Sequence, residues 1–150
     1  ENYIDRYVFE IQETLRENNF ENDTLIIFAG DNGPEQTFKG SALRHSTDTF
    51  GSTLFERGFK RTCFQGGTHS PVIMKWPGKI KKGTVYNKMF SLVDLYATFA
   101  ELAGVPLKGP YTENSISHAN LVTGRKQTKE REVLTCEYCN KQYVNFAEFV

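Results

Sequence analysis

The sequence has 150 residues, 39% of them hydrophobic, and its 18 basic and 18 acidic side chains give a formal net charge of zero. This apolar content is enough for one ordinary globular unit. Zero net charge excludes a global field that would recruit nucleic acid or an anionic membrane, and no apolar run approaches the roughly 20 residues that span a bilayer. The chain opens on Glu1 without a signal peptide or an initiator Met, so we expect a truncated start and infer no compartment from it.

The N-terminal segment predicts an amphipathic helix. Apolar residues recur at helical spacing, while acidic and basic side chains occupy the other face. The apolar positions are Ile4, Val8, Ile11 and Leu15. We expect the asparagines at 18, 19 and 22 to end this helix before the next element.

A buried strand is predicted at Thr24–Phe28, and it runs into the sequence Gly-Asp-Asn-Gly at residues 30–33. A fully apolar strand favours a sheet that is covered on both faces. Asp31 and Asn32 carry the hard oxygen donors that calcium- or magnesium-type cations prefer, and the flanking glycines allow a sharp turn. Ligands of parallel α/β sheets collect beyond the carboxyl ends of the strands. The segment therefore predicts either a plain turn or a cation site.

Residues 34–58 lack clear periodicity and predict a long loop, which in a compact domain is usually functional or disordered. The next segment contains Lys60, which by itself would be a solvated surface lysine. A short strand is predicted at Pro71–Trp76, ended by Pro77 and Gly78, and the Lys79–Lys82 cluster favours a solvated turn.

Residues 90–103 predict a second amphipathic helix, ended by Gly104 and Pro106. From 107 to 132 the chain is polar and loop-rich, with a short apolar patch at Ala119–Val122. Strands of a smaller sheet are predicted at Val133–Tyr138 and Gln142–Val150.

Several ordered motifs resemble the sulfatase family. That family has an Asp-Asn-Gly strand end, an Arg-Gly-x-Lys segment, an aromatic-x-Gly-Gly turn and a strand that closes on Trp-Pro-Gly, followed by a helix and a smaller subdomain. The matching stretches are residues 31–33, 57–60, 64–67, 76–78, 91–106, 121–124 and 131–134. Together they cover roughly residues 1–138, and their order is far more specific than any one motif.

The resemblance implies an α/β fold: the C-terminal part of a mixed sheet flanked by helices, plus a small antiparallel sheet subdomain. Residues 1–107 would be the C-terminal part of the catalytic domain, and residues 108–150 the start of the smaller C-terminal subdomain. Part of a sheet exposes edges and apolar faces, so we expect the isolated chain to be unstable.

The resemblance also implies that Asp31 and Asn32 are Ca²⁺ ligands and that Lys60 is a catalytic residue that contacts the sulfate and the leaving-group oxygen. The chemistry agrees, because negative charge grows on the bridging oxygen as the ester bond breaks, and a cation and an ammonium beside it stabilise that charge. We expect a sulfuric-ester hydrolase acting on a small-molecule or carbohydrate sulfate ester, without nucleic-acid or membrane partners. A periplasmic, secreted or lysosomal location is implied by the family.

The nucleophile implied by the resemblance is absent from this sequence. Sulfatases use a Cys or Ser, in Cys/Ser-x-Pro/Ala-x-Arg, that is oxidised to formylglycine, and no such sequence occurs here. The early Asp-Asp pair of the family's cation site is also missing, and two side chains cannot supply the about six or more oxygens that calcium needs. We expect the C-terminal portion of a sulfatase, inactive alone, with formylglycine in an upstream part.

Other titratable residues have weaker cases. His69 could act as a general acid, but the matching family position varies and is not generally catalytic. His45 and His118 lie in polar loop sequence. Asp94 is expected to be a structural hydrogen-bonding group inside a helix.

The cysteines and two arginines are expected to be incidental. Cys136 and Cys139 have the spacing of half a zinc site without a second pair, and Cys63 is isolated. The alternative for the three cysteines is a role in a disulfide or a metal site. Arg57 and Arg61 could help to bind an anion, but solvent exposure is favoured.

Two other functions stay open. One is a phosphodiesterase or phosphonate hydrolase of the same alkaline-phosphatase-like superfamily, which a threonine nucleophile in the parent protein would indicate. The segment from Lys60 to Trp-Pro-Gly favours a sulfatase instead. The other is a non-catalytic anion-binding module, which a full-length gene without the nucleophile sequence would indicate.

Overall fold

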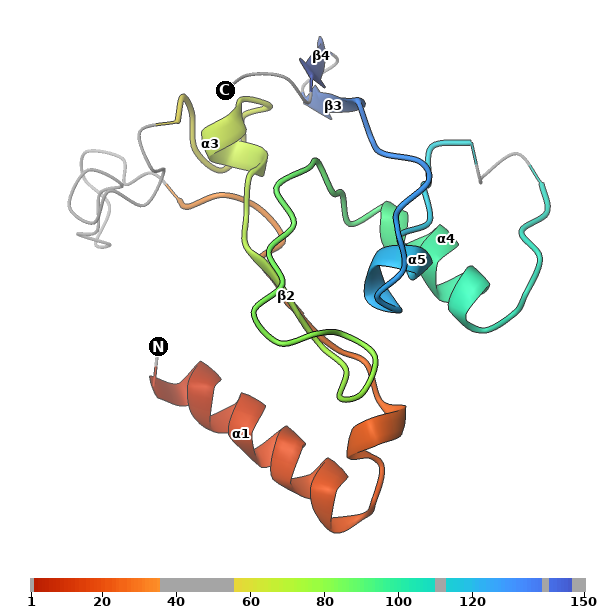
Figure 1. Cartoon of the computed structure of the whole chain (residues 1–150). Helices are drawn as coiled ribbons and strands as arrows, with labels where there is room; N and C mark the ends of the chain where they lie inside the picture. The colour runs from red at the N-terminus through yellow and green to blue at the C-terminus, as the bar shows by residue number, and fades with distance from the viewer. Residues whose placement is uncertain (1, 36–55, 110–112, 139–140, 147–150) are drawn as a thin grey trace. The chain divides into compact units, whose positions relative to one another are not determined.

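The computed structural model describes residues 2–35, 56–109, 113–138 and 141–146 (Figure 1). The chain divides into two units, residues 1–27 with 74–130 and residues 28–73 with 131–150. Helices accompany two two-stranded sheets, so the expected α/β class is confirmed. Within the described residues, no helix has the length and apolar character needed to cross a membrane. The expected division at residue 107 stays a prediction.

Helix α1, Asn2–Glu17, confirms the first predicted helix. It ends where expected, since Asn19 adopts the left-handed backbone conformation, with φ of 60°, that Asn tolerates. A short 3-10 helix, η1, follows at Glu21–Asp23. The apolar stripe of α1 stays uncovered in the described part of the chain, because Ile4 and Ile11 are each 54% exposed and no residue of α1 is buried.

Strands β1, Ile26–Ala29, and β2, Val72–Lys75, form one sheet. Strand β2 lies inside its predicted span, whereas β1 ends one residue beyond the predicted end at Phe28. The Gly30 amide donates to the Pro71 carbonyl, and the Trp76 indole N–H donates to the Asn22 carbonyl. These contacts join the two strands in opposite order, so the pair is antiparallel. The rule that ligands collect beyond the carboxyl ends of parallel strands therefore does not apply to this pair. The loop after β1 is positioned instead by its contacts with the segment before β2.

The remaining elements are short. Helix α3 is Gln65–Thr68, α4 is Asp94–Leu102 and α5 is Ala119–Val122. Helix α4 begins four residues later than predicted, and α5 was expected only as an apolar patch in a loop. Strands β3, Val133–Tyr138, and β4, Lys141–Phe146, pair antiparallel from Val133 opposite Phe146 to Tyr138 opposite Lys141. The predicted small antiparallel sheet is confirmed.

Candidate functional site

The loop after β1 is held against the residues that precede β2. The Gly30 amide donates to the Pro71 carbonyl at 3.1 Å, and the Ser70 hydroxyl donates to the Gly30 carbonyl at 2.8 Å. Asp31 is exposed and Asn32 is half-buried. The Asn32 amide Nδ2 donates to Asp31 Oδ1 at 2.8 Å, so the carboxylate and the carboxamide are in direct contact.

Close backbone packing of glycines brings this loop to the Gly-Gly turn. The Gly33 amide donates to the Gly67 carbonyl at 2.9 Å, and a Cβ on Gly33 would lie 2.0 Å from the Gly66 carbonyl oxygen. A Cβ on Gly66 would in turn lie 2.3 Å from the carbonyl oxygen of Gly58. The chain bends at residues 31–33, where a sharp turn was expected, but the φ of Gly33 is not positive, so the turn itself does not require glycine there. Its role is close approach of two backbones.

Lys60 lies on the segment that this glycine packing places beside the Asp31 loop. Its backbone amide donates to the Pro34 carbonyl at 2.8 Å. The side chain is half-buried, and its ammonium makes no ion pair with any residue that the structure describes. Residues 31–34 and Lys60, two of the predicted site segments, are therefore brought together by backbone hydrogen bonds.

Asp31 and Asn32 fit part of a calcium site. A carboxylate and a carboxamide oxygen are hard donors, but calcium takes about six to eight of them. No group of three or more His, Cys, Asp or Glu residues suited to a metal occurs among the described residues. The Asn32 carboxamide also presents its nitrogen to Asp31, so it must turn to offer its oxygen to a cation.

His69 has a partner that the sequence did not indicate. Its Nδ1 lies 2.7 Å from Glu56 Oε1, a residue that falls in the predicted long loop and carries no local signal of its role. Arg57 and Arg61 are exposed, as favoured above, and the Arg57 guanidinium lies 3.9 Å from the Phe64 ring centroid.

Of the predicted cysteines and of His45, the structure describes Cys63 and Cys136. Cys63 is buried and Cys136 is half-buried. His45 and Cys139 lie outside the described residues, as does most of the predicted loop at 34–58.

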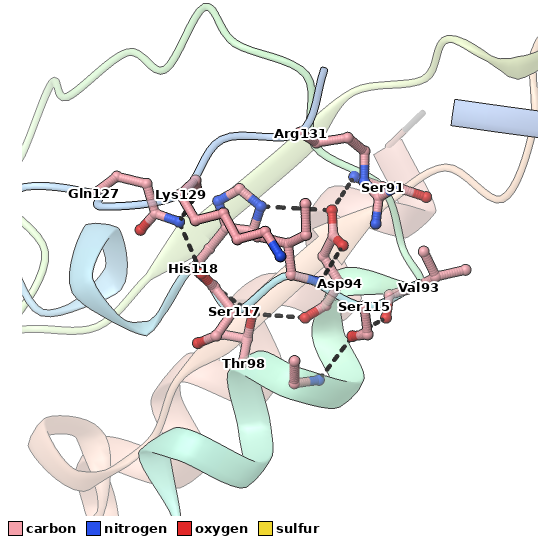
Figure 2. Close-up of polar contacts among 12 residues, drawn as sticks. Ser91, Val93, Asp94, Thr98, Ser115, Ser117, His118, Gln127, Lys129 and Arg131 are labelled. Carbon is pink, nitrogen blue, oxygen red and sulfur yellow. Dashed lines mark hydrogen bonds and ion pairs between the residues drawn. The ribbon is translucent and has the colours of Figure 1, made fainter. Parts of the chain in front are cut away.

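His118 was expected in polar loop sequence, but its side chain is fully buried in the other unit (Figure 2). Its Nε2 lies 3.4 Å from Asp94 Oδ2, which is ion-pair range without hydrogen-bond geometry. The Phe90 ring packs edge-on against the imidazole at a centroid distance of 5.0 Å. His118 does lie in a loop, and its burial results from tertiary packing, which the polarity of the neighbouring sequence does not predict.

Asp94 is the hydrogen-bonding group that was expected, although it begins α4 and does not lie inside it. Its carboxylate accepts from the Ser91 amide at 3.0 Å and from the Ile116 amide at 2.8 Å (Figure 2). The Thr98 hydroxyl donates to the Asp94 carbonyl and accepts from the His118 amide. Asp94 thus joins the start of α4 to the segment before α5.

Two side chains of this unit have shifted pKa values. A hydrogen bond from Lys75 Nζ has the largest effect on the Glu21 carboxyl and, together with the Lys75 and Arg16 charges, lowers its pKa against the opposing effect of burial. Burial, with the Glu130 and Asp94 carboxylates, raises the pKa of Tyr86.

Comparison with known proteins gives consistent matches. The family model described as Sulfatase matches residues 2–105. The chain is 28% identical over 133 residues to N-acetylgalactosamine-6-O-sulfatase of Bacteroides thetaiotaomicron, covering 87% of the chain and 26% of that protein. It is 33% identical over 145 residues to human steryl-sulfatase, covering 95% of the chain and 24% of that protein. The chain thus spans about a quarter of the length of these relatives.

Solved structures agree. The PsFucS1 sulfatase of Pseudoalteromonas sp. matches with a TM-score of 0.77 and 26% identity, over 96% of this chain and 28% of that one. A Bacteroides thetaiotaomicron structure from work on glycosaminoglycan metabolism matches with a TM-score of 0.76 and 26% identity, over 95% of this chain and 30% of that one.

Proposed function

The chain belongs to the sulfatase family, and we propose that it is part of a sulfuric-ester hydrolase in which Asp31 and Asn32 supply calcium ligands and Lys60 binds the sulfate. The relatives support a sulfate ester as substrate, since they are named for the sulfates of N-acetylgalactosamine and of steroids. When bound, calcium would offset negative charge on the ester oxygens.

One observation carries this proposal. Two backbone hydrogen bonds, from Gly33 to Gly67 and from Lys60 to Pro34, tie the Asp31 loop to the Lys60 segment. The carboxylate and the ammonium therefore come from segments whose backbones are neighbours. A cation held by Asp31, with the Lys60 ammonium as a second positive charge nearby, is suited to bind an anionic ester.

Each residue has a separate task. The Asp31 carboxylate would hold the cation, joined by the Asn32 carboxamide oxygen once that group has turned, and two donors leave room for ligands from elsewhere in the protein. The Lys60 ammonium donates hydrogen bonds to the sulfate and stabilises the leaving oxygen as the bond to sulfur breaks. The formylglycine nucleophile would come from a Cys/Ser-x-Pro/Ala-x-Arg sequence outside these 150 residues.

The test is expression of the complete reading frame that encodes the chain. We expect release of inorganic sulfate from 4-nitrophenyl sulfate or N-acetylgalactosamine 6-sulfate, together with a formylglycine-bearing peptide in the mass spectrum. Hydrolysis of a phosphodiester with a threonine nucleophile would support the phosphodiesterase alternative. Sulfate binding without turnover by either route would support the anion-binding module.

A further inference from the structure

Glu56 and His69 form a hydrogen-bonded pair, and His69 Nε2 makes no hydrogen bond or ion pair with any residue that the structure describes. His69 Nδ1 lies 2.7 Å from Glu56 Oε1, and the His69 side chain is 65% exposed while that of Glu56 is 24% exposed. An ionised carboxylate only accepts hydrogen bonds, so the ring proton belongs on Nδ1. In the neutral ring Nε2 then keeps a lone pair and is an acceptor.

The pair is built on the same two loops as the proposed site. Glu56 lies on the segment that contains Lys60. It directly precedes Arg57, whose carbonyl accepts a hydrogen bond from the Gly66 amide at 2.8 Å. His69 directly precedes Ser70, whose hydroxyl donates to the carbonyl of Gly30, the residue before Asp31. The backbone at His69 is therefore held next to the loop that carries the proposed cation ligands.

We propose that His69 is a specificity-determining residue of the sulfatase site, which accepts through Nε2 a hydrogen bond from a hydroxyl group on the alcohol part of the sulfate ester. Glu56 is its positioning residue, because it fixes the proton on Nδ1. This inference rests on the proposed function and deepens it: the substrate class is a carbohydrate sulfate, which carries free hydroxyls near the ester, and not a simple aryl sulfate.

If the Glu56–His69 pair served only to stabilise the fold, its loss would affect thermal unfolding and not substrate preference. Exposed ion pairs contribute little to folding, typically about 0–1 kcal/mol. Loss of this pair should therefore leave thermal unfolding almost unchanged, and any large kinetic effect must come from the substrate.

The experiment compares kcat/KM of the full-length protein for N-acetylgalactosamine 6-sulfate and for 4-nitrophenyl sulfate. His69→Ala should lower the ratio of the two values, sugar over aryl, by about 2- to 10-fold, which is the net contribution of one hydrogen bond. Glu56→Ala should lower it partly. His69→Gln, whose amide oxygen can reach the position of Nε2, should restore much of the ratio, whereas His69→Asn should not. Lys82→Ala, on the exposed turn, is the control and should change neither value.

An unchanged ratio in His69→Ala, or equal loss on both esters, would overturn the role of His69. Wild-type turnover of the aryl ester without turnover of the sugar ester would overturn the substrate class. If the wild type cleaves neither of these esters nor a steroid sulfate, the proposed function itself fails, and this inference fails with it.

Discussion

The backbone amide of Lys60 donates a 2.8 Å hydrogen bond to the carbonyl of Pro34, two residues beyond Asn32. The lysine is therefore located by its main chain, and its side chain is not needed to hold the loops together. Asp31 is located in the same way, through the main chain of Gly30 and Gly33. Substitutions of either side chain should consequently report on chemistry and not on folding.

Lys60→Ala in the full-length protein should lower kcat for sulfate-ester hydrolysis by about 100-fold or more, the typical loss when one preorganised charge-stabilising donor is removed. Thermal unfolding should stay near the wild-type value. Lys79→Ala, an exposed lysine on the following turn, is the matched control. Steady-state kinetics on 4-nitrophenyl sulfate measure both. Wild-type turnover by Lys60→Ala would remove Lys60 from the site.

Asp31→Asn should weaken calcium binding, because affinity at oxygen sites depends on the number of charged ligands. We expect the calcium concentration for half-maximal activity to rise by about 10-fold, after the protein has been stripped with a chelator. Asp23→Asn, exposed in η1, removes the same charge elsewhere and should have no effect. If neither the chelator nor the Asp31→Asn substitution changes the activity, Asp31 is not a calcium ligand.

Local patterns predicted the elements whose shape depends on local residues. Helix α1 follows from apolar periodicity, and β3 was predicted with the bounds that the structure has. The Glu56–His69 pair and the burial of His118 could not be predicted, because each depends on partners that are distant in sequence. Charge or polarity of one residue does not report which residue lies opposite it in the fold.

The candidate site divides in the same way. Asp31, Asn32 and Lys60 could be named from their residue types and motif order, but the reason for their proximity could not. That reason is the close packing of the Gly33 backbone against Gly66. The structure shows this contact as a short distance, but nothing in the sequence pairs these two glycines. The glycines around Asp31 were interpreted as turn residues, and close approach explains Gly33 instead.

Gly33→Ala should therefore separate the two loops. Its Cβ would lie 2.0 Å from the Gly66 carbonyl oxygen, so the backbone must move. We expect a loss of about 2 kcal/mol or more in the free energy of unfolding, measured by urea denaturation, and lower turnover. Gly78→Ala is the contrast: its φ of 76° costs about 1 kcal/mol, but no atom lies within 4 Å of the new Cβ. Equal effects of both substitutions would contradict the packing argument.

Asp94→Ala should destabilise the protein strongly, because it deprives the Ser91 and Ile116 amides of their acceptor. A fully buried donor left unpaired costs about 1–3 kcal/mol, and both amides are only half-buried, so we expect a total loss of about 1–3 kcal/mol. Asp94→Asn keeps one acceptor oxygen and should cost less. Urea midpoints of the three proteins test this order. A change below about 1 kcal/mol in the free energy of unfolding of Asp94→Ala would contradict the view that Asp94 joins the start of α4 to the segment before α5.

Tyr86→Phe should leave stability at pH 7 unchanged or slightly improved, because the Tyr86 hydroxyl is buried and has no hydrogen-bond partner among the described residues. Burial raises the pKa of Tyr86, so the folded state holds the phenolic proton more tightly than the unfolded chain does. This contribution is intact below the ordinary value of about 10 and is lost as the pH rises through the folded-state pKa.

Urea denaturation between pH 8 and pH 11 measures the prediction. The wild type should lose stability at the alkaline end, and Tyr86→Phe should lose less because phenylalanine does not ionise. Tyr96→Phe removes a hydroxyl from a side chain that is 54% exposed, so it should retain the wild-type alkaline loss. An alkaline loss in Tyr86→Phe as large as in the wild type would mean that the buried phenol does not control stability in this range.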